Sequence, residues 1–113
     1  MDKRKNDYYY FAKIREDLLF ITRHMRDTEI EDLARNELLQ DSMMFRLIQI
    51  SENARKMSDA FQTDHEEIPW MAMYGLRNRL VHDYGNVDLN VVYETLKKDI
   101  PELLDLLTEA DLV

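Results

Sequence analysis

Only four residues in this chain of 113 are strong helix breakers: Gly75, Gly85, Pro69 and Pro101. Tight turns depend on glycine and proline, because these residues supply the backbone conformations that turns need. A strand-rich fold of this length requires several such turns. The scarcity of breakers therefore favours a few long helices.

Apolar residues recur at the three- and four-residue spacing that marks one face of a helix. Three stripes of this kind are present. They comprise Phe11, Ile14, Leu18, Ile21 and Met25; Met43, Leu47, Ile50, Ala54, Met57 and Phe61; and Leu89, Val92, Leu96, Ile100, Leu103 and Leu107. Together with a shorter segment between the second and third stripes, they predict an all-α, up-and-down bundle of four main helices. We expect residues 1–113 to form a single domain.

The start of the second helix is indicated by Thr28 and Glu31, which have the spacing of a capping box. The pattern leaves two alternatives open for this helix. It runs unbroken from about Glu29 to Phe61, or it breaks near Asn36.

The third and fourth helices also carry boundary signals. Ile68-Pro69-Trp70 predicts the start of the third helix, because proline suits a first helical turn, and Met73, Leu76 and Leu80 supply its apolar face. Asp88 is expected to cap the fourth helix. Pro101 lies inside the apolar stripe of that helix, so we expect a kink near Asp99.

Three adjacent tyrosines precede Phe11, and a helix cannot turn all of these rings toward one core. At least one ring should therefore meet solvent or a partner. Packing within the monomer and packing in a dimer interface both remain open. Most of the seven methionines lie on the apolar stripes and are expected to fill the core.

Composition excludes several classes of protein. The chain has no cysteine, which rules out disulfides, cysteine–zinc sites and cysteine nucleophiles. No apolar run approaches the ~18 residues of a membrane span. Residues 1–26 are too charged for a signal peptide, so a cytoplasmic protein is expected. The three histidines His24, His65 and His82 have no metal-site spacing, and no glycine-rich phosphate loop is present, so we expect neither a metal nor a cofactor.

The net charge of −8 is distributed unevenly. Residues 1–26 contain more basic than acidic residues, whereas no basic residue follows Asp99. Proteins that bind nucleic acid over a wide surface usually carry a basic surplus. Contact with RNA, if it occurs, must therefore be local.

The densest cluster of reactive groups runs from Arg77 to Tyr84 as Arg-Asn-Arg-Leu-Val-His-Asp-Tyr. It lies where the third helix should end, just before Gly85. Asn78 and His82 are four residues apart and would share a helical face. Arg77 and His82 are five residues apart, which separates them by roughly 140° around a helix axis. Both can reach one ligand only if the helix unwinds near His82 or a second chain completes the site.

A histidine and an arginine together can cleave RNA without a metal. Histidine titrates near neutral pH and can give and take protons. Arginine offers a fixed charge and a planar fork for phosphate. One group activates the ribose 2′-hydroxyl while the cation stabilises the charge of the transition state. The alternative is that Arg77 and His82 only cap the carboxyl end of a helix, where cations are favoured.

The order Arg77-x4-His82-x-Tyr84 resembles the Arg-x4-His-x-Tyr signature of the HEPN superfamily, specifically the HepT-like toxins. Further matches follow in the family's order. Residues 47–54 are similar to its mid-helix motif Ile-Gly-Glu-Ala, with Ser51 in place of glycine and Asn53 in place of alanine. Residues 68–70 resemble its proline–tryptophan helix start, and residues 87–89 and 99–103 resemble its last helix. The resemblance covers about residues 11–107.

This resemblance implies an all-α homodimer in which two Arg-x4-His motifs form a metal-independent ribonuclease cleft. Carried over by position, Arg77 and His82 are the catalytic pair, and Asn78 is the polar residue beside them. Tyr84 corresponds to the tyrosine that an MntA-like minimal nucleotidyltransferase antitoxin modifies with AMP. The expected partners are thus RNA, a second copy of the chain and such an antitoxin.

Two other functions remain open: a non-catalytic HEPN module that positions a nucleotidyltransferase, and a helical adaptor whose motif only caps a helix. If the chain binds RNA, several basic side chains are candidate phosphate contacts. They are Arg77 and Arg79, with Arg46, Arg55 and Lys56 added if the second helix lines the cleft. Arg79 has an alternative partner in Asp83.

Overall fold

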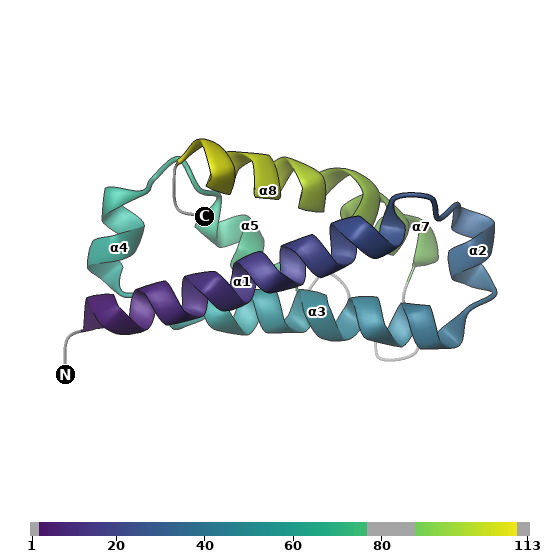
Figure 1. The fold of residues 1–113 in the computed structure, drawn as a ribbon, viewed down its shortest axis with the longest axis horizontal. Coiled ribbons are helices and arrows are strands. Elements are labelled where there is room, and N and C mark those ends of the chain that lie inside the picture. Colours follow the sequence, from purple (N-terminus) through teal and green to yellow (C-terminus); the bar gives the residue numbers. More distant parts are fainter. Residues whose placement is uncertain (1–2, 77–87, 111–113) are drawn as a thin grey trace.

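Two long helices, α1 (Lys3–Met25) and α3 (Glu37–Arg55), lie side by side and antiparallel through the length of the molecule (Figure 1). The computed structural model describes residues 3–76 and 88–110, with side chains from Asn6 onward. A short helix, α2 (Ile30–Ala34), reverses the chain between α1 and α3. The long pair forms the base on which the remaining elements pack.

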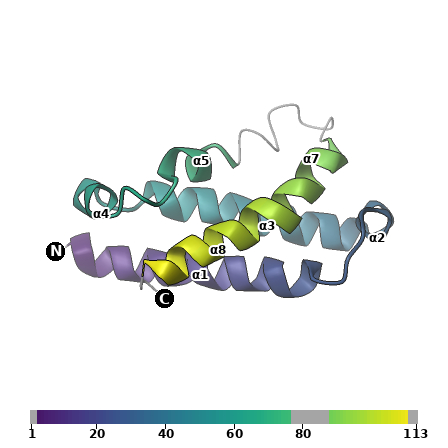
Figure 2. The same cartoon turned by 90° about the horizontal axis from the view of Figure 1, so that it is seen from above.

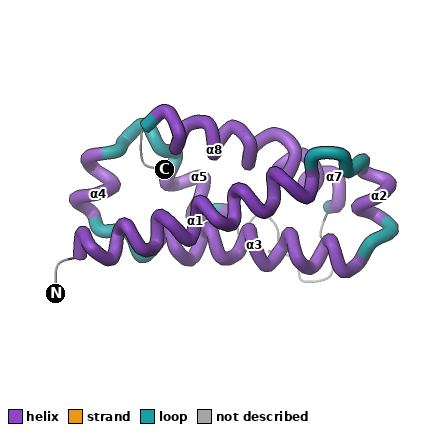
Figure 3. Tube along the Cα trace, in the orientation of Figure 1, coloured by secondary structure: helices purple, strands orange, loops and turns teal. Residues whose placement is uncertain are grey.

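Shorter helices pack against each member of this pair. α4 (Asp59–Asp64) reverses the chain after α3, and α5 (Trp70–Tyr74) then packs against α3. α7 (Leu89–Glu94) lies beside α2, and α8 (Ile100–Glu109) packs along α1 (Figure 2). The described residues contain helices and loops and no β-strand (Figure 3). The prediction of an all-α bundle is confirmed. The third helix, predicted to continue unbroken past Leu76, instead ends at Tyr74 with Gly75 as its cap, and Leu80 lies outside the described residues.

The predicted apolar stripes form the core. Every residue of the first two stripes is buried, and the third stripe is buried except for Leu89, which is half-buried. Burying one large aliphatic side chain stabilises a fold by roughly 1.5–3 kcal/mol. The three stripes thus supply the main force that holds α1, α3 and α8 together.

The second helix is broken at two places. Asn36 caps α3, and its Oδ1 accepts a hydrogen bond from the Leu39 amide at 3.0 Å, so the alternative with a break near Asn36 is correct. A second break, which the stripe does not predict, separates α3 from α4. Ser58 caps α4 there, and its Oγ accepts from the Phe61 amide at 3.2 Å. Side chains of this kind favour helix starts because they satisfy amides that lack a helical partner.

The capping box predicted at Thr28 and Glu31 is wrong by one residue. Glu29 is the cap of α2, and its amide donates to the Asp32 carboxylate at 3.0 Å. The Thr28 hydroxyl instead donates to the His24 carbonyl at 2.8 Å. Thr28 therefore closes α1 and does not open α2.

The predicted irregularity before Pro101 takes the form of a π-helical turn, η1 (Thr95–Asp99), between α7 and α8. Proline has no amide hydrogen, and its ring collides with the carbonyl four residues earlier in a regular helix. A wider turn removes this collision. Within this turn, the Lys97 ammonium donates a hydrogen bond to the Met25 carbonyl at 2.9 Å, at the carboxyl end of α1.

The tyrosine run at the start of α1 divides between solvent and protein. Tyr8 and Tyr9 are exposed, Tyr10 is half-buried and Phe11 is buried. Four of the methionines, Met25, Met43, Met57 and Met73, are buried, whereas Met71 is exposed. Within the described parts of the chain, no helix has the length and apolar character to span a membrane.

Candidate functional site

The five residues of the predicted catalytic segment, Arg77, Asn78, Arg79, His82 and Tyr84, lie outside the described residues. Their catalytic, RNA-binding and modification roles therefore stay predictions. The structure does describe the two helices that bound this segment, which are α5 before it and α7 after it. The contacts of these helices fix the described residues on either side of the segment.

The start of α5 is firmly anchored. The helix begins at Trp70, within the predicted stretch, but Pro69 is the N-cap and lies just before the first turn instead of in it. The Trp70 ring is buried and meets Phe61 of α4 edge-to-face, with ring centroids 6.0 Å apart. Its indole nitrogen donates to the His65 carbonyl at 3.0 Å. Aromatic packing and a satisfied indole N–H together fix the direction of α5.

The end of α5 is tied to α3 by Ser51. This side chain is fully buried, and its Oγ donates to the carbonyl of Tyr74 at 2.9 Å. The carbonyl accepts a second hydrogen bond, from the Arg55 guanidinium, at 3.3 Å. Tyr74 precedes Arg77 by three residues, so both bonds hold the backbone immediately before the predicted motif.

The role of Ser51 was not evident from the sequence. The sequence shows only that Ser51 takes the place of the glycine in the mid-helix motif of the family. The one local indication is a hydroxyl on a helix face that is otherwise apolar. A buried hydroxyl almost always has a hydrogen-bond partner, so such a residue predicts a contact with another element.

The Tyr74 side chain extends the same network toward α4. Its hydroxyl donates to the side-chain oxygen of Gln62, whose amide donates to the Met57 carbonyl at 3.2 Å. Burial raises the pKa of the Tyr74 hydroxyl above its ordinary value. The group therefore stays a neutral donor at physiological pH. These contacts join α3, α4 and α5 at the entrance to the catalytic segment.

The other flank of the segment begins at Asp88. Its carboxylate accepts from the Asn90 amide at 2.9 Å and caps α7, which confirms the predicted helix start. The Tyr93 hydroxyl then donates to the Thr28 carbonyl at 3.1 Å, which ties α7 to the turn after α1. The predicted catalytic segment thus connects two helix ends that are each held by hydrogen bonds.

Two of the predicted phosphate contacts, Arg46 and Arg55, lie on opposite sides of α3. They are nine residues apart, which corresponds to about half a turn around the helix axis. Arg46 faces α1, where it pairs with Asp17 at 2.9 Å and lies over the Phe20 ring at 3.8 Å. Arg55 faces α5, with its guanidinium 5.2 Å from the Tyr74 ring. The structure does not bring these two arginines together. Of the two, only Arg55 contacts Tyr74, three residues before Arg77 in the sequence.

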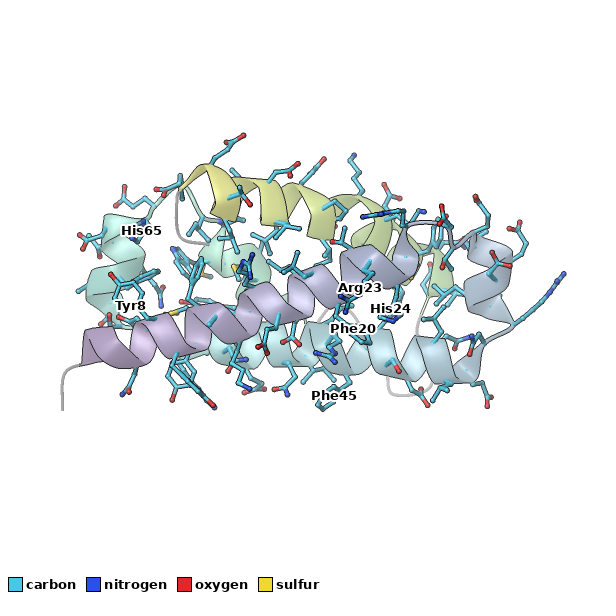
Figure 4. All side chains as sticks on the ribbon, in the orientation of Figure 1. Tyr8, Phe20, Arg23, His24, Phe45 and His65 are labelled. Carbon is cyan, nitrogen blue, oxygen red and sulfur yellow. The ribbon has the colours of Figure 1, made fainter. Side chains whose placement is uncertain are left out.

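The two described histidines lie at opposite ends of the bundle (Figure 4). His24 stacks on Phe20, with ring centroids 4.0 Å apart, and its Nδ1 lies 2.9 Å from the Phe20 carbonyl. His65 lies 3.5 Å from the Glu67 carboxylate. Across residues 3–76 and 88–110, no three histidine or carboxylate side chains gather as a metal site would require.

Taken together, the described residues form a helical bundle in which α5 and α7 flank, in sequence, a segment that contains Arg77, Arg79 and His82. The chain belongs to the ribonuclease HepT-like family, because the family model with this description matches residues 14–110. That match includes α3, α5 and the whole of the predicted catalytic segment.

Several relatives bear names that agree with this family. One, named "Probable ribonuclease HepT", from Thermococcus cleftensis, is 33% identical over 94 residues, which cover 83% of this chain and 86% of the relative. Another, from Caldanaerobacter subterraneus subsp. tengcongensis and named as a "Putative RNase", is 28% identical, over 83% of this chain and 84% of the relative.

A third relative is a longer protein of Methanocaldococcus jannaschii, named as a "Gamma-glutamylcyclotransferase and putative RNase". It is 30% identical over 112 residues. The match covers 96% of this chain but only 50% of that relative. No solved structure matches the chain significantly.

Proposed function

We propose that this chain is a metal-independent endoribonuclease and acts as the toxin of a toxin–antitoxin pair. The observation that carries the proposal is the match to the ribonuclease HepT-like family across the segment that contains Arg77 and His82. Relatives named as ribonucleases support RNA as the substrate. The Ser51 and Arg55 hydrogen bonds to the Tyr74 carbonyl support a fixed position for the chain just before that segment.

The proposed chemistry assigns a separate role to each side chain. The His82 imidazole takes the proton of the ribose 2′-hydroxyl or gives a proton to the leaving 5′-oxygen. The Arg77 guanidinium binds the phosphate and stabilises the negative charge that grows on it. Asn78 orients the phosphate or the histidine by hydrogen bonding. The expected products are a 2′,3′-cyclic phosphate and a free 5′-hydroxyl.

The active species in this proposal is a homodimer. In-line cleavage needs a base on one side of the phosphate and an acid on the other, and one chain supplies only one histidine at this segment. A two-fold axis next to the segment provides the second, because a symmetric dimer places the same groups on both sides of the axis.

Regulation is proposed to act through Tyr84, two residues after His82. A nucleotidyltransferase antitoxin would transfer AMP from ATP to the tyrosine hydroxyl and release pyrophosphate. The new phosphodiester carries a negative charge that competes with the substrate phosphate for Arg77, and the adenosine blocks the cleft.

Cleavage of a labelled single-stranded RNA in the presence of a chelator tests the proposed activity. We expect cleavage to continue in the chelator and to yield cyclic phosphate ends. Activity that returns only with added magnesium or manganese would contradict the metal-independent mechanism. A chain that binds a nucleotidyltransferase but cleaves no RNA would instead be a non-catalytic HEPN module.

A further inference from the structure

A polar groove of about 320 Å³ lies between α1 and α3, on the side of α3 that faces away from α5. We call it the α1–α3 groove. Its lining includes Tyr9, Tyr10 and Lys13 from α1 and Gln49, Asn53 and Lys56 from α3 and its carboxyl end, together with the charged residues Glu16, Asp17 and Arg46. Its volume is at the lower end of the ~300–1,000 Å³ typical of small-molecule sites.

Asn53 is the most informative residue of this groove. It keeps only 8% of its surface exposed and belongs to the groove lining. Among the described residues, its side-chain amide has no hydrogen-bond partner, nor does that of neighbouring Gln49. In the described part of the chain, Thr22 Oγ1 is the only fully buried side-chain nitrogen or oxygen without a partner, so the Asn53 and Gln49 amides are accessible from the groove. Both amides are thus available to a ligand with donors and acceptors at its edge.

Aromatic rings and ammonium groups lie next to these amides. The Tyr9 and Tyr10 rings meet edge-to-face, with centroids 5.3 Å apart. The Lys13 ammonium is 5.8 Å from the Tyr9 ring, and the Lys56 ammonium is 5.3 Å from the Tyr10 ring. Proteins that bind single-stranded nucleic acid combine these groups, because bases stack on the rings while cations contact the phosphates.

The charge of the groove contrasts with that of the whole chain. The buried Asp17 carboxylate is paired with Arg46, so the remaining charged residues of the described groove lining are Lys13, Lys56 and Glu16. The groove is therefore locally basic on a chain of net charge −8. Exposed lysines are uncommon in the centre of protein–protein interfaces, which favours a phosphate ligand over a second protein surface.

We propose that the α1–α3 groove binds one nucleotide of a single-stranded RNA. The base lies against Tyr10 and forms hydrogen bonds at its edge with the amides of Gln49 and Asn53. The adjoining phosphates contact Lys13 and Lys56. This inference rests on the proposed ribonuclease function, and it adds a substrate subsite outside the Arg77–Tyr84 segment.

Fluorescence anisotropy with a labelled 2′-O-methyl single-stranded RNA tests the subsite, because this RNA lacks the hydroxyl required for cleavage. Asn53→Ala should weaken binding about 2- to 10-fold, as expected for one lost hydrogen bond. It should leave the unfolding midpoint unchanged or raised, since no protein hydrogen bond is lost. Tyr10→Leu should weaken binding about 5- to 150-fold. Exposed Tyr8, changed in a Tyr8→Leu control, should have little effect.

The lysines are tested through the salt dependence of binding. Lys13→Ala and Lys56→Ala should each reduce the salt slope by about 0.7, the value for one phosphate contact on a single strand. Lys98→Ala is the matched control, because Lys98 is exposed on η1 and lies outside the groove. Photo-crosslinking of a 4-thiouridine RNA should label the peptide that contains Tyr9 and Tyr10.

Two results would overturn the subsite. In one, the groove variants bind RNA as the wild type does. In the other, they lose a dimer in sedimentation while RNA binding and crosslinking remain, which would make the groove a protein interface. Wild-type cleavage of unmodified RNA, measured in parallel, separates these results from failure of the proposed function. Wild-type protein that cleaves RNA while its groove variants bind normally would exclude the subsite alone.

Discussion

Removing Arg46 should leave the Asp17 carboxylate buried without its partner. The Asp17 side chain is only 8% exposed and the Arg46 side chain 30%, and their contact of 2.9 Å joins α1 to α3. A hydrogen bond to a charged group contributes roughly 1.5–3 kcal/mol. The loss of one partner of a fully buried pair costs more, but Arg46 is partly solvated. For Arg46→Met, which keeps much of the packing on Phe20, we expect a loss of about 2–3 kcal/mol in the free energy of unfolding.

The loss of stability in Arg46→Met should depend on pH in a definite direction. Burial raises the pKa of Asp17 above its ordinary value of 3.8, and the Arg46 hydrogen bond and charge act in the opposite direction. A raised pKa in the folded state means that stability is greatest below the ordinary value and is lost as the pH rises through the folded-state pKa. Arg46→Met removes the opposing effect and raises this pKa further. The variant should therefore be more destabilised at neutral pH than in mild acid.

Urea unfolding followed by far-UV circular dichroism measures both quantities. Arg15→Met is the matched control, because Arg15 is exposed on α1, and its unfolding midpoint should barely change. Adding Asp17→Asn to Arg46→Met should recover much of the lost stability at neutral pH, since the amide carries no charge into the buried site. An equal loss for Arg46→Met at neutral pH and in mild acid would refute the argument from the buried carboxylate.

Three further predictions concern the catalytic segment and its anchor. Ser51→Ala should lower the free energy of unfolding by about 1 kcal/mol and reduce cleavage, because the Tyr74 carbonyl loses a hydrogen bond. Urea unfolding measures the first effect, and an RNA cleavage assay measures the second. Mixing Arg77→Ala chains with wild type should lower activity more than dilution predicts, and activity that simply tracks the wild-type fraction would contradict a composite dimer site. Co-expression with the nucleotidyltransferase should add an AMP-sized mass to the peptide with Tyr84 and none in Tyr84→Phe; a silenced protein with unmodified Tyr84 would contradict this.

The core of this fold could be predicted because it depends on a local, periodic property. The apolar stripes follow the 3.6-residue repeat of a helix, and their burial needs no knowledge of which helices become neighbours. The same periodicity conceals the break at Ser58, because Met57 and Phe61 keep the helical spacing across it and both are buried. Only the capping side chain marks that boundary.

The contacts around the site depend on residues far apart in the sequence, and no local pattern signals them. Asp17 and Arg46 are 29 residues apart, and Ser51 and Tyr74 are 23 residues apart. The resemblance identified the segment from Arg77 onward, because its residue types and order carry chemistry directly. The groove beside Asn53 is formed by residues of both α1 and α3, so it depends on how these two helices pack and not on either sequence segment alone.

The role of His82 in RNA cleavage is the central claim, and single-turnover cleavage in a chelator tests it most directly. We expect His82→Ala to lose about 10²–10⁴-fold in rate, as is usual when a general acid–base group is removed. Its helical circular dichroism should match that of the wild type. The control His24→Ala, which changes an exposed histidine stacked on Phe20, should retain most of the activity. Cleavage by His82→Ala at the wild-type rate would contradict the account.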